Sequence, residues 1–294
     1  MNSIFKGTGV AMVTPFNEDY SIDFDSLTKL VEHLIQGGVD YLVVMGTTAE
    51  SPTLSMDEKQ AVLQHVIKYN AYRLPIVFGI GGNNTAEITN TLKSFDLKGV
   101  SGILSVSPYY NKPSQEGIYR HYMALAEASP LPIIIYNVPG RTGSNISAST
   151  TLRLARDSKK LVAVKEASGN MEQIMQIKKD APENFLVISG DDAITMPLIS
   201  CGIDGVISVV GNAFPKEFSD MVRAATANDY ETARKLHYML LDPIRMMFAE
   251  GNPGGVKAFL NQMGILKNVL RLPAYKVSDK LFEDIKTELN KIKK

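Results

Sequence analysis

The chain has 294 residues, its 31 lysines and arginines balance 31 aspartates and glutamates, and 45% of its residues are hydrophobic. A neutral chain lacks the basic excess with which proteins bind nucleic acids or anionic membranes, and its single cysteine excludes a disulfide framework. No apolar run approaches the ~18 residues that a membrane-spanning helix needs, and the first residues do not resemble a signal peptide, so we expect a cytoplasmic globular protein.

Eight short apolar runs recur along the chain and predict β-strands. They cover residues 7–13, 41–45, 75–80, 102–106, 132–137, 161–165, 185–189 and 205–210. Runs such as YLVVM and PIIIY are apolar throughout, which is typical of strands covered on both faces. Helical patterns separate the strands and cover 24–37, 55–72, 85–97, 114–128, 147–156, 171–179, 193–200 and 216–227. The second of them begins with Ser55 and Glu58 at the spacing of a capping box.

The alternation of strand and helix predicts parallel strands joined by right-handed crossovers. Eight such units favour an α/β fold of the (β/α)8 TIM-barrel type over an open doubly wound sheet. An open sheet usually carries a nucleotide fingerprint, but GIGGNN has Asn84 in place of the third glycine. After Asn228 three further helices are predicted, over 230–247, 255–263 and 278–292. We therefore predict a catalytic barrel over residues 1–228 and a C-terminal helical domain over 229–294.

Lys165 is the most informative residue of the predicted barrel. Barrel enzymes carry their catalytic groups at the carboxyl ends of the strands, where Lys165 stands. By strand parity its side chain should face the same way as Ala163 and Leu161, into the lumen. Burial favours an uncharged amine, which can attack a ketone. The spacing alone is equally compatible with a lysine that pairs with Glu166 or emerges at the rim.

Hydroxyl side chains follow three other predicted strands and would meet above Lys165. Thr47 and Thr48 end the second strand, Tyr109 and Tyr110 the fourth, and Tyr136 the fifth. Chained hydroxyls can move protons during imine formation and carbon–carbon bonding without burying a charge. This set favours a nucleophilic Lys165.

Neither a metal nor a cofactor is expected. The four histidines are scattered over predicted helices without metal-ligand spacing. Asp191 and Asp192 are interpreted as caps of the following helix, and Cys201 as a small buried residue at a helix end. The loops after the last two strands, where barrels often hold phosphate, carry SGDD and no basic residue, which argues against a phosphorylated substrate.

Seven motifs follow one another along the chain: VTPF, GTTAES, PYYNKPSQEG, YNVPGRTG, VKEASGN, SGDDA and GVISV. In this order and spacing the chain resembles the dihydrodipicolinate synthase family, within the pyruvate-dependent N-acetylneuraminate lyase superfamily. The resemblance implies that Lys165 forms a Schiff base with pyruvate and that Tyr136 serves as general acid and base. It also implies that Thr47 and Tyr110 complete a proton relay.

The resemblance extends to substrate contacts. Thr48 and Ile207 match the residues that hold pyruvate through its carboxylate and through backbone contact, and Gly190 lines the same pocket. Arg141 matches the anchor for the carboxylate of L-aspartate 4-semialdehyde, a role suited to a two-pronged guanidinium. The chain departs from the usual GTTGES by Ala49, which tests the loop geometry but removes no functional group.

The implied reaction condenses pyruvate with L-aspartate 4-semialdehyde to 4-hydroxy-tetrahydrodipicolinate, on the diaminopimelate and lysine route. The alternative is a related lysine-dependent lyase that acts on N-acetylneuraminate or another 2-keto-acid aldol. A more distant alternative is a non-catalytic barrel that binds a metabolite. The resemblance further implies a homotetramer built as a dimer of dimers, in which Tyr110 reaches the neighbouring subunit's site.

Many members of the family are inhibited by L-lysine in a cleft at the dimer interface. Four residues here fit the family's pattern and two do not: Ser51, Asn83, Glu87 and Tyr109 fit, whereas Met56 and Lys59 do not. Lys59 would place a like charge near the ligand's ammonium, and at an effective dielectric constant of about 20 two charges ~5 Å apart repel by about 3 kcal/mol. We therefore expect weak or absent inhibition by L-lysine.

Overall fold

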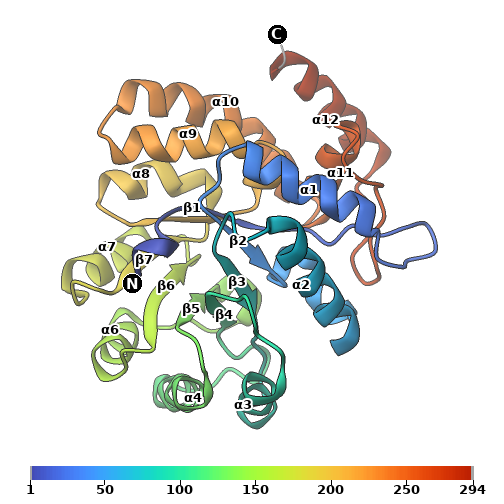
Figure 1. Cartoon of the computed structure of the whole chain (residues 1–294). Coiled ribbons are helices and arrows are strands. Elements are labelled where there is room, and N and C mark those ends of the chain that lie inside the picture. The colour runs from blue at the N-terminus through green and yellow to red at the C-terminus, as the bar shows by residue number, and fades with distance from the viewer. Residues whose placement is uncertain (1, 293–294) are drawn as a thin grey trace.

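A computed structural model describes residues 2–292, and the eight predicted strands form a closed parallel barrel (Figure 1). The strands are β1 (Gly7–Ala11), β2 (Tyr41–Val44), β3 (Ile76–Gly79), β4 (Gly102–Val106), β5 (Ile133–Asn137), β6 (Leu161–Glu166), β7 (Leu186–Ser189) and β8 (Gly205–Ser208). Each strand pairs with the next, and β8 closes the barrel by pairing with β1. The predicted (β/α)8 TIM barrel is confirmed.

Helices surround the barrel, as Figure 1 shows. They are α1 (Phe24–Gln36), α2 (Met56–Asn70), α3 (Thr85–Ser94), α4 (Gln115–Ala128), α6 (Ala148–Asp157), α7 (Met171–Asp180), α8 (Thr195–Ser200) and α9 (Pro215–Thr226). Ser55 and Glu58 form the predicted capping box at the start of α2. One short helix, α5 (Pro139–Thr142), was not predicted, because a single turn has too few residues to show a period.

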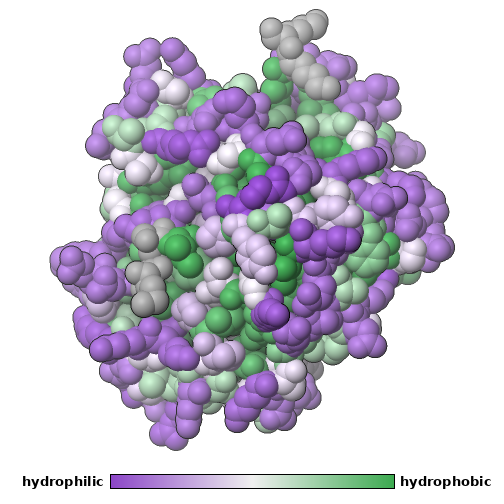
Figure 2. Space-filling view, viewed as in Figure 1, coloured by the Kyte–Doolittle hydropathy of each residue, from purple (hydrophilic) through white to green (hydrophobic). Residues whose placement is uncertain are grey.

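The three predicted C-terminal helices are present as α10 (Tyr230–Ala249), α11 (Gly254–Gln262) and α12 (Asp279–Ile292). Helix α10 packs along α9, and α12 packs against α10 and α11. The boundary expected after Asn228 lies between α9 and α10, and the division into two domains stays a prediction. Figure 2 shows the face seen in Figure 1, largely hydrophilic with smaller apolar areas between the helices. In the part of the chain that the structure describes, none of the helices is apolar over the length needed to cross a bilayer.

The barrel has an inner and an outer hydrophobic core. The inner core fills the lumen and includes Phe5 and Tyr41, which contact each other edge to face with their ring centres 6.2 Å apart. Phe5 belongs to a short 3-10 helix, η1 (Asn2–Phe5), that precedes β1. A Cβ on Gly102, at the start of β4, would lie 2.7 Å from the Phe5 ring. Aromatic side chains therefore fill the lumen at its amino end, and its carboxyl end is left for a site.

Two details differ from the sequence-based expectations. Leu161 packs in the outer core and not in the lumen, because the pairing of β5 with β6 shifts after Leu161 and brings Val162 and Ala163 into the inner core. Strand parity is reliable only where the pairing is regular. Cys201 is exposed and not buried, because it lies at the carboxyl end of α8, where the chain leaves the helix.

Candidate active site

Lys165 and Tyr136 lie side by side on neighbouring strands. They are register partners in the β5–β6 pair, and both are buried, with 5% and 6% of their surface exposed. The Lys165 Nζ lies 4.2 Å from the centre of the Tyr136 ring. Among residues 2–292, no hydrogen bond or ion pair is found for the Lys165 ammonium. The amine is thus buried beside a phenol without a charged partner, which suits it for attack on a carbonyl.

Glu166 does not neutralise Lys165. Its carboxylate is fully buried and accepts hydrogen bonds from Asn137 Nδ2 at 3.0 and 3.1 Å, from Gln173 Nε2 at 3.0 Å and from the Ser168 amide at 2.8 Å. Because consecutive strand residues point to opposite faces, Glu166 lies outside the lumen. The interpretation of Lys165 as the ion-pair partner of Glu166 is therefore wrong.

Because Gly190 has no side chain, the Lys165 side chain has room beside it. A Cβ at Gly190 would lie 2.7 Å from the Cβ of Ala167 and 3.0 Å from the Cε of Lys165. On the neighbouring strand β8, Ile207 is buried in the inner core, and its role as a pyruvate contact stays a prediction. The structure therefore brings Gly190 against Lys165 and places Ile207 in the same lumen.

Asp192 links the loops after β7 and β8, which the sequence did not indicate. Asp191 caps the following turn as expected, since its Oδ1 accepts a hydrogen bond from the Ala193 amide at 3.0 Å. Asp192 instead accepts hydrogen bonds from the amides of Val209 at 3.0 Å and Val210 at 2.9 Å. Burial raises the pKa of the Asp192 carboxyl to about 6. The only sign of this contact in the sequence would have been an acidic residue in a loop, placed near two successive backbone amides that lack other partners.

The loop after β2 consists of two consecutive 3-10 turns, η2 (Thr47–Ala49) and η3 (Ser51–Thr53), and the first turn carries both Thr47 and Thr48. Thr48 is buried, and its Oγ1 accepts a hydrogen bond from Asn252 Nδ2 at 3.0 Å. Thr47 is exposed. Ala49 has an ordinary negative φ, so the alanine that replaces the family's glycine fits this loop without backbone strain.

A cavity of about 470 Å³ opens at the carboxyl ends of β2 to β5. Thr47, Tyr136 and Arg141 line it. The six residues of the predicted lysine cleft line the same cavity: Ser51, Met56, Lys59, Asn83, Glu87 and Tyr109. Burial lowers the pKa of the half-buried Lys59 ammonium. The predicted lysine cleft therefore shares one cavity with Thr47, Tyr136 and Arg141, whereas Lys165, Thr48, Gly190 and Ile207 are not among the lining residues.

Two predicted residues, Tyr110 and Arg141, are exposed in the single chain, and only Arg141 lines the cavity. Tyr110 is 88% exposed, has a left-handed φ of 73° and does not line the cavity. Arg141, on α5, is exposed at the cavity mouth, and within residues 2–292 its guanidinium has no ion-pair partner. An unpaired guanidinium can receive a carboxylate. No group of three or more histidine, cysteine or acidic side chains placed to hold a metal ion occurs among these residues.

The model of the dihydrodipicolinate synthetase family matches residues 4–292. The chain belongs to this family. The 4-hydroxy-tetrahydrodipicolinate synthase of Parabacteroides distasonis is 53% identical over 287 residues, which cover 98% of this chain and 97% of that protein. The resemblance to this family, which was inferred from seven motifs, is therefore confirmed over nearly the full length of the chain.

Solved structures of the family agree with the fold. The chloride-inhibited dihydrodipicolinate synthase of Acinetobacter baumannii, in complex with pyruvate, superposes with a TM-score of 0.95 at 38% identity and covers 98% of this chain and 99% of its own. The DHDPS of Cyanidioschyzon merolae with lysine bound has a TM-score of 0.94 at 35% identity, with 99% of each chain covered.

Proposed function

We propose that this chain condenses pyruvate with L-aspartate 4-semialdehyde through a Schiff base and forms 4-hydroxy-tetrahydrodipicolinate for diaminopimelate and lysine biosynthesis. The observation that carries the proposal is the unpaired Lys165 amine beside Tyr136, 4.2 Å from the ring centre. Family membership supports the same reaction. A cytoplasmic location and a homotetrameric assembly are part of the proposal.

In the first half of the reaction, the neutral Lys165 amine adds to the C2 carbonyl of pyruvate. The carbonyl oxygen takes up a proton, and a second proton lets it leave as water, so that an imine to Lys165 remains. We assign this proton transfer to Tyr136, with Thr47 and the Tyr110 of a neighbouring subunit as relay groups. Thr48 and the backbone at Ile207 hold the pyruvate, and Gly190 leaves room for the imine.

In the second half, the imine loses a proton from its methyl carbon and becomes an enamine. That carbon attacks the aldehyde of L-aspartate 4-semialdehyde, whose carboxylate is held by Arg141. The substrate's own amine then adds to the imine carbon and expels Lys165, which closes the ring and regenerates the enzyme. Each proton that leaves a carbon or nitrogen here can return through the same hydroxyls.

Trapping the imine tests the proposal directly. Pyruvate with borohydride should attach irreversibly to the chain, and peptide mapping should find the adduct at Lys165. An adduct at another lysine, or one that persists in Lys165→Ala, contradicts the assignment. Consumption of L-aspartate 4-semialdehyde with pyruvate then separates the proposed reaction from cleavage of N-acetylneuraminate, which should not proceed.

A further inference from the structure

The loop that carries Thr47 and Thr48 is held by residues that follow it by about two hundred positions. Asn252 Nδ2 donates to Thr48 Oγ1 at 3.0 Å. The Glu50 carboxylate binds Lys257 Nζ at 2.5 Å through one oxygen and the Arg271 amide at 2.9 Å through the other. The C-terminal segment therefore contacts both the pyruvate-binding threonine and the residue at the bend of the loop.

Glu50 has an unusual backbone for its residue type. It joins η2 to η3 with φ 56° and ψ 32°, in the left-handed region that a glycine adopts at least cost. A side chain at such a position needs a compensating interaction. The two contacts of the buried carboxylate supply it, because they hold the bend from outside the loop.

Lys257 is the fully buried half of this ion pair. Its Nζ also donates to the Val269 carbonyl at 2.9 Å and lies 4.3 Å from the centre of the Phe16 ring. Burial lowers the pKa of the Lys257 ammonium to about 8. A buried ion pair adds little net stability compared with well-packed apolar residues. We therefore attribute to this pair a role in fixing the position of Glu50 and not in stabilising the fold.

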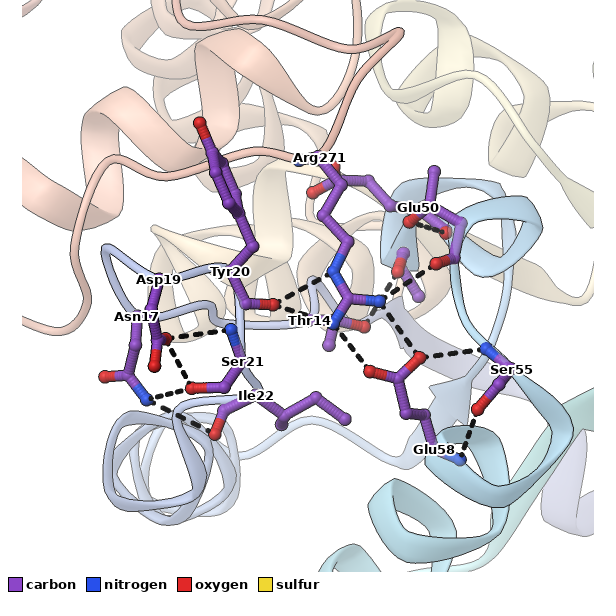
Figure 3. Close-up of polar contacts among 12 residues, drawn as sticks. Thr14, Asn17, Asp19, Tyr20, Ser21, Ile22, Glu50, Ser55, Glu58 and Arg271 are labelled. Atoms are coloured by element: carbon purple, nitrogen blue, oxygen red, sulfur yellow. Dashed lines mark hydrogen bonds and ion pairs between the residues drawn. The ribbon is translucent and has the colours of Figure 1, made fainter.

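Arg271 holds the far end of the loop. Its guanidinium donates to the Thr53 carbonyl at 2.9 Å, to the Tyr20 carbonyl at 2.7 Å and to both oxygens of Glu58, at 2.6 and 3.0 Å. Figure 3 shows Arg271 between Tyr20 and Glu58, with Glu50 beside it. Residues 252, 257 and 271 thus hold the beginning, the bend and the end of one loop.

We propose that Glu50 is a positioning residue for catalysis: the C-terminal segment holds it, and through it sets Thr47 and Thr48 relative to Lys165. The inference rests on the proposed function, since it assigns these threonines to the pyruvate half of the site. It makes part of the C-terminal segment a support of the pyruvate site, which acts through Thr48 and Glu50.

The inference predicts a split between the two substrates. Loosening the loop displaces Thr47 and Thr48, so the KM for pyruvate should rise and kcat should fall. Arg141 stands on α5 in another loop, and no hydrogen bond or ion pair joins it to Glu50, Lys257 or Asn252. The KM for the semialdehyde should therefore change little. A purely structural role would lower the amount of active enzyme without changing either KM.

The experiment compares Glu50→Gln, Lys257→Met, the double variant and Asn252→Ala. Active sites are counted by borohydride trapping at saturating pyruvate, and kcat is expressed per trapped site. We expect at least a tenfold rise in pyruvate KM for Glu50→Gln and about threefold for Asn252→Ala, with the semialdehyde KM within twofold. The double variant should resemble the worse single variant, because the two groups act as one pair.

Lys178→Met is the matched control. It removes an ion pair of 2.7 Å to Asp204, which precedes β8 at the opposite end of the barrel. Both KM values should stay unchanged in it. An unchanged pyruvate KM and kcat per site in every variant that folds overturns the inference, and if only Asn252→Ala folds, that variant decides. Failure of the proposed function is distinct: the unmutated enzyme would then trap no pyruvate or leave the semialdehyde unconsumed.

Discussion

Gly190 and Lys165 are in direct van der Waals contact, and a methyl group on Gly190 would approach the lysine Cε to 3.0 Å. The nearer neighbour, Ala167 Cβ at 2.7 Å, cannot rotate away. Gly190→Ala should therefore shift the loop or the lysine, destabilise the fold by about 1–3 kcal/mol and slow imine trapping by tenfold or more. Gly140→Ala is the control, because nothing lies within 4 Å of its added Cβ. Equal trapping rates in the two variants would contradict this prediction.

Arg141→Ala should impair the second substrate selectively. Loss of a two-pronged carboxylate contact costs a few kcal/mol, so kcat/KM for the semialdehyde should fall roughly 100-fold. Imine formation with pyruvate should proceed at its normal rate, because the exposed Arg141 is assigned to the second substrate and not to pyruvate. If trapping falls as far as turnover does, Arg141 has a structural role instead.

Tyr110 should act in the site of a neighbouring subunit. It is 88% exposed and does not line its own chain's cavity. Mixed assemblies of Tyr110→Phe and Lys165→Ala subunits should regain activity, since some sites then combine an intact lysine with an intact tyrosine. The measurement is turnover after subunit exchange has been verified by mass spectrometry. Exchange without any recovery argues against a shared site.

Inhibition by L-lysine should be weak or absent. The half-buried Lys59 ammonium faces the same cavity as Glu87 and Tyr109 and would repel an amino group of the ligand. Lys59→Glu should therefore strengthen inhibition about fivefold or more, while Lys59→Met should have a smaller effect. Inhibition curves at saturating semialdehyde measure both. Sub-millimolar sensitivity of the unmutated enzyme would overturn this prediction.

His121 should make the fold sensitive to mild acid. Burial lowers the pKa of its imidazole from 6.5 to about 4, and the Thr85 hydroxyl lies 2.8 Å from its Nδ1. The imidazole binds a proton more readily in the unfolded chain than in the folded one. The contribution of neutral His121 to the free energy of unfolding is therefore fully present above pH 6.5 and is lost as the pH falls towards 4. The loss should be on the order of 2–3 kcal/mol.

Urea unfolding at pH 7 and pH 4.5 checks this for the unmutated chain and for His121→Gln, which has no titrating imidazole. The difference in unfolding free energy between the two proteins should shift by about 2–3 kcal/mol in favour of the variant at pH 4.5. A parallel loss of stability in both proteins would assign the acid sensitivity to other groups.

Local sequence was sufficient to predict the barrel, and it singled out Lys165, whose role as the nucleophile stays a prediction. Each strand is short and largely apolar, and Lys165 is conspicuous because it follows four apolar residues in β6. The position of Leu161 could not be predicted, because the irregular pairing near it depends on β5. The contacts of Glu50 with Lys257 and of Asp192 with the loop after β8 join distant segments, and no local period signals such contacts.

The aromatic closure of the lumen by Phe5 and Tyr41 has a consequence for the order of events in a turnover. With one end filled, both substrates enter and the product leaves through the same mouth. In the proposed reaction pyruvate binds deepest, against Lys165, so a semialdehyde that arrives first would block its path. Excess semialdehyde should therefore inhibit competitively with pyruvate, and each product molecule must clear the mouth before the next pyruvate can reach the amine.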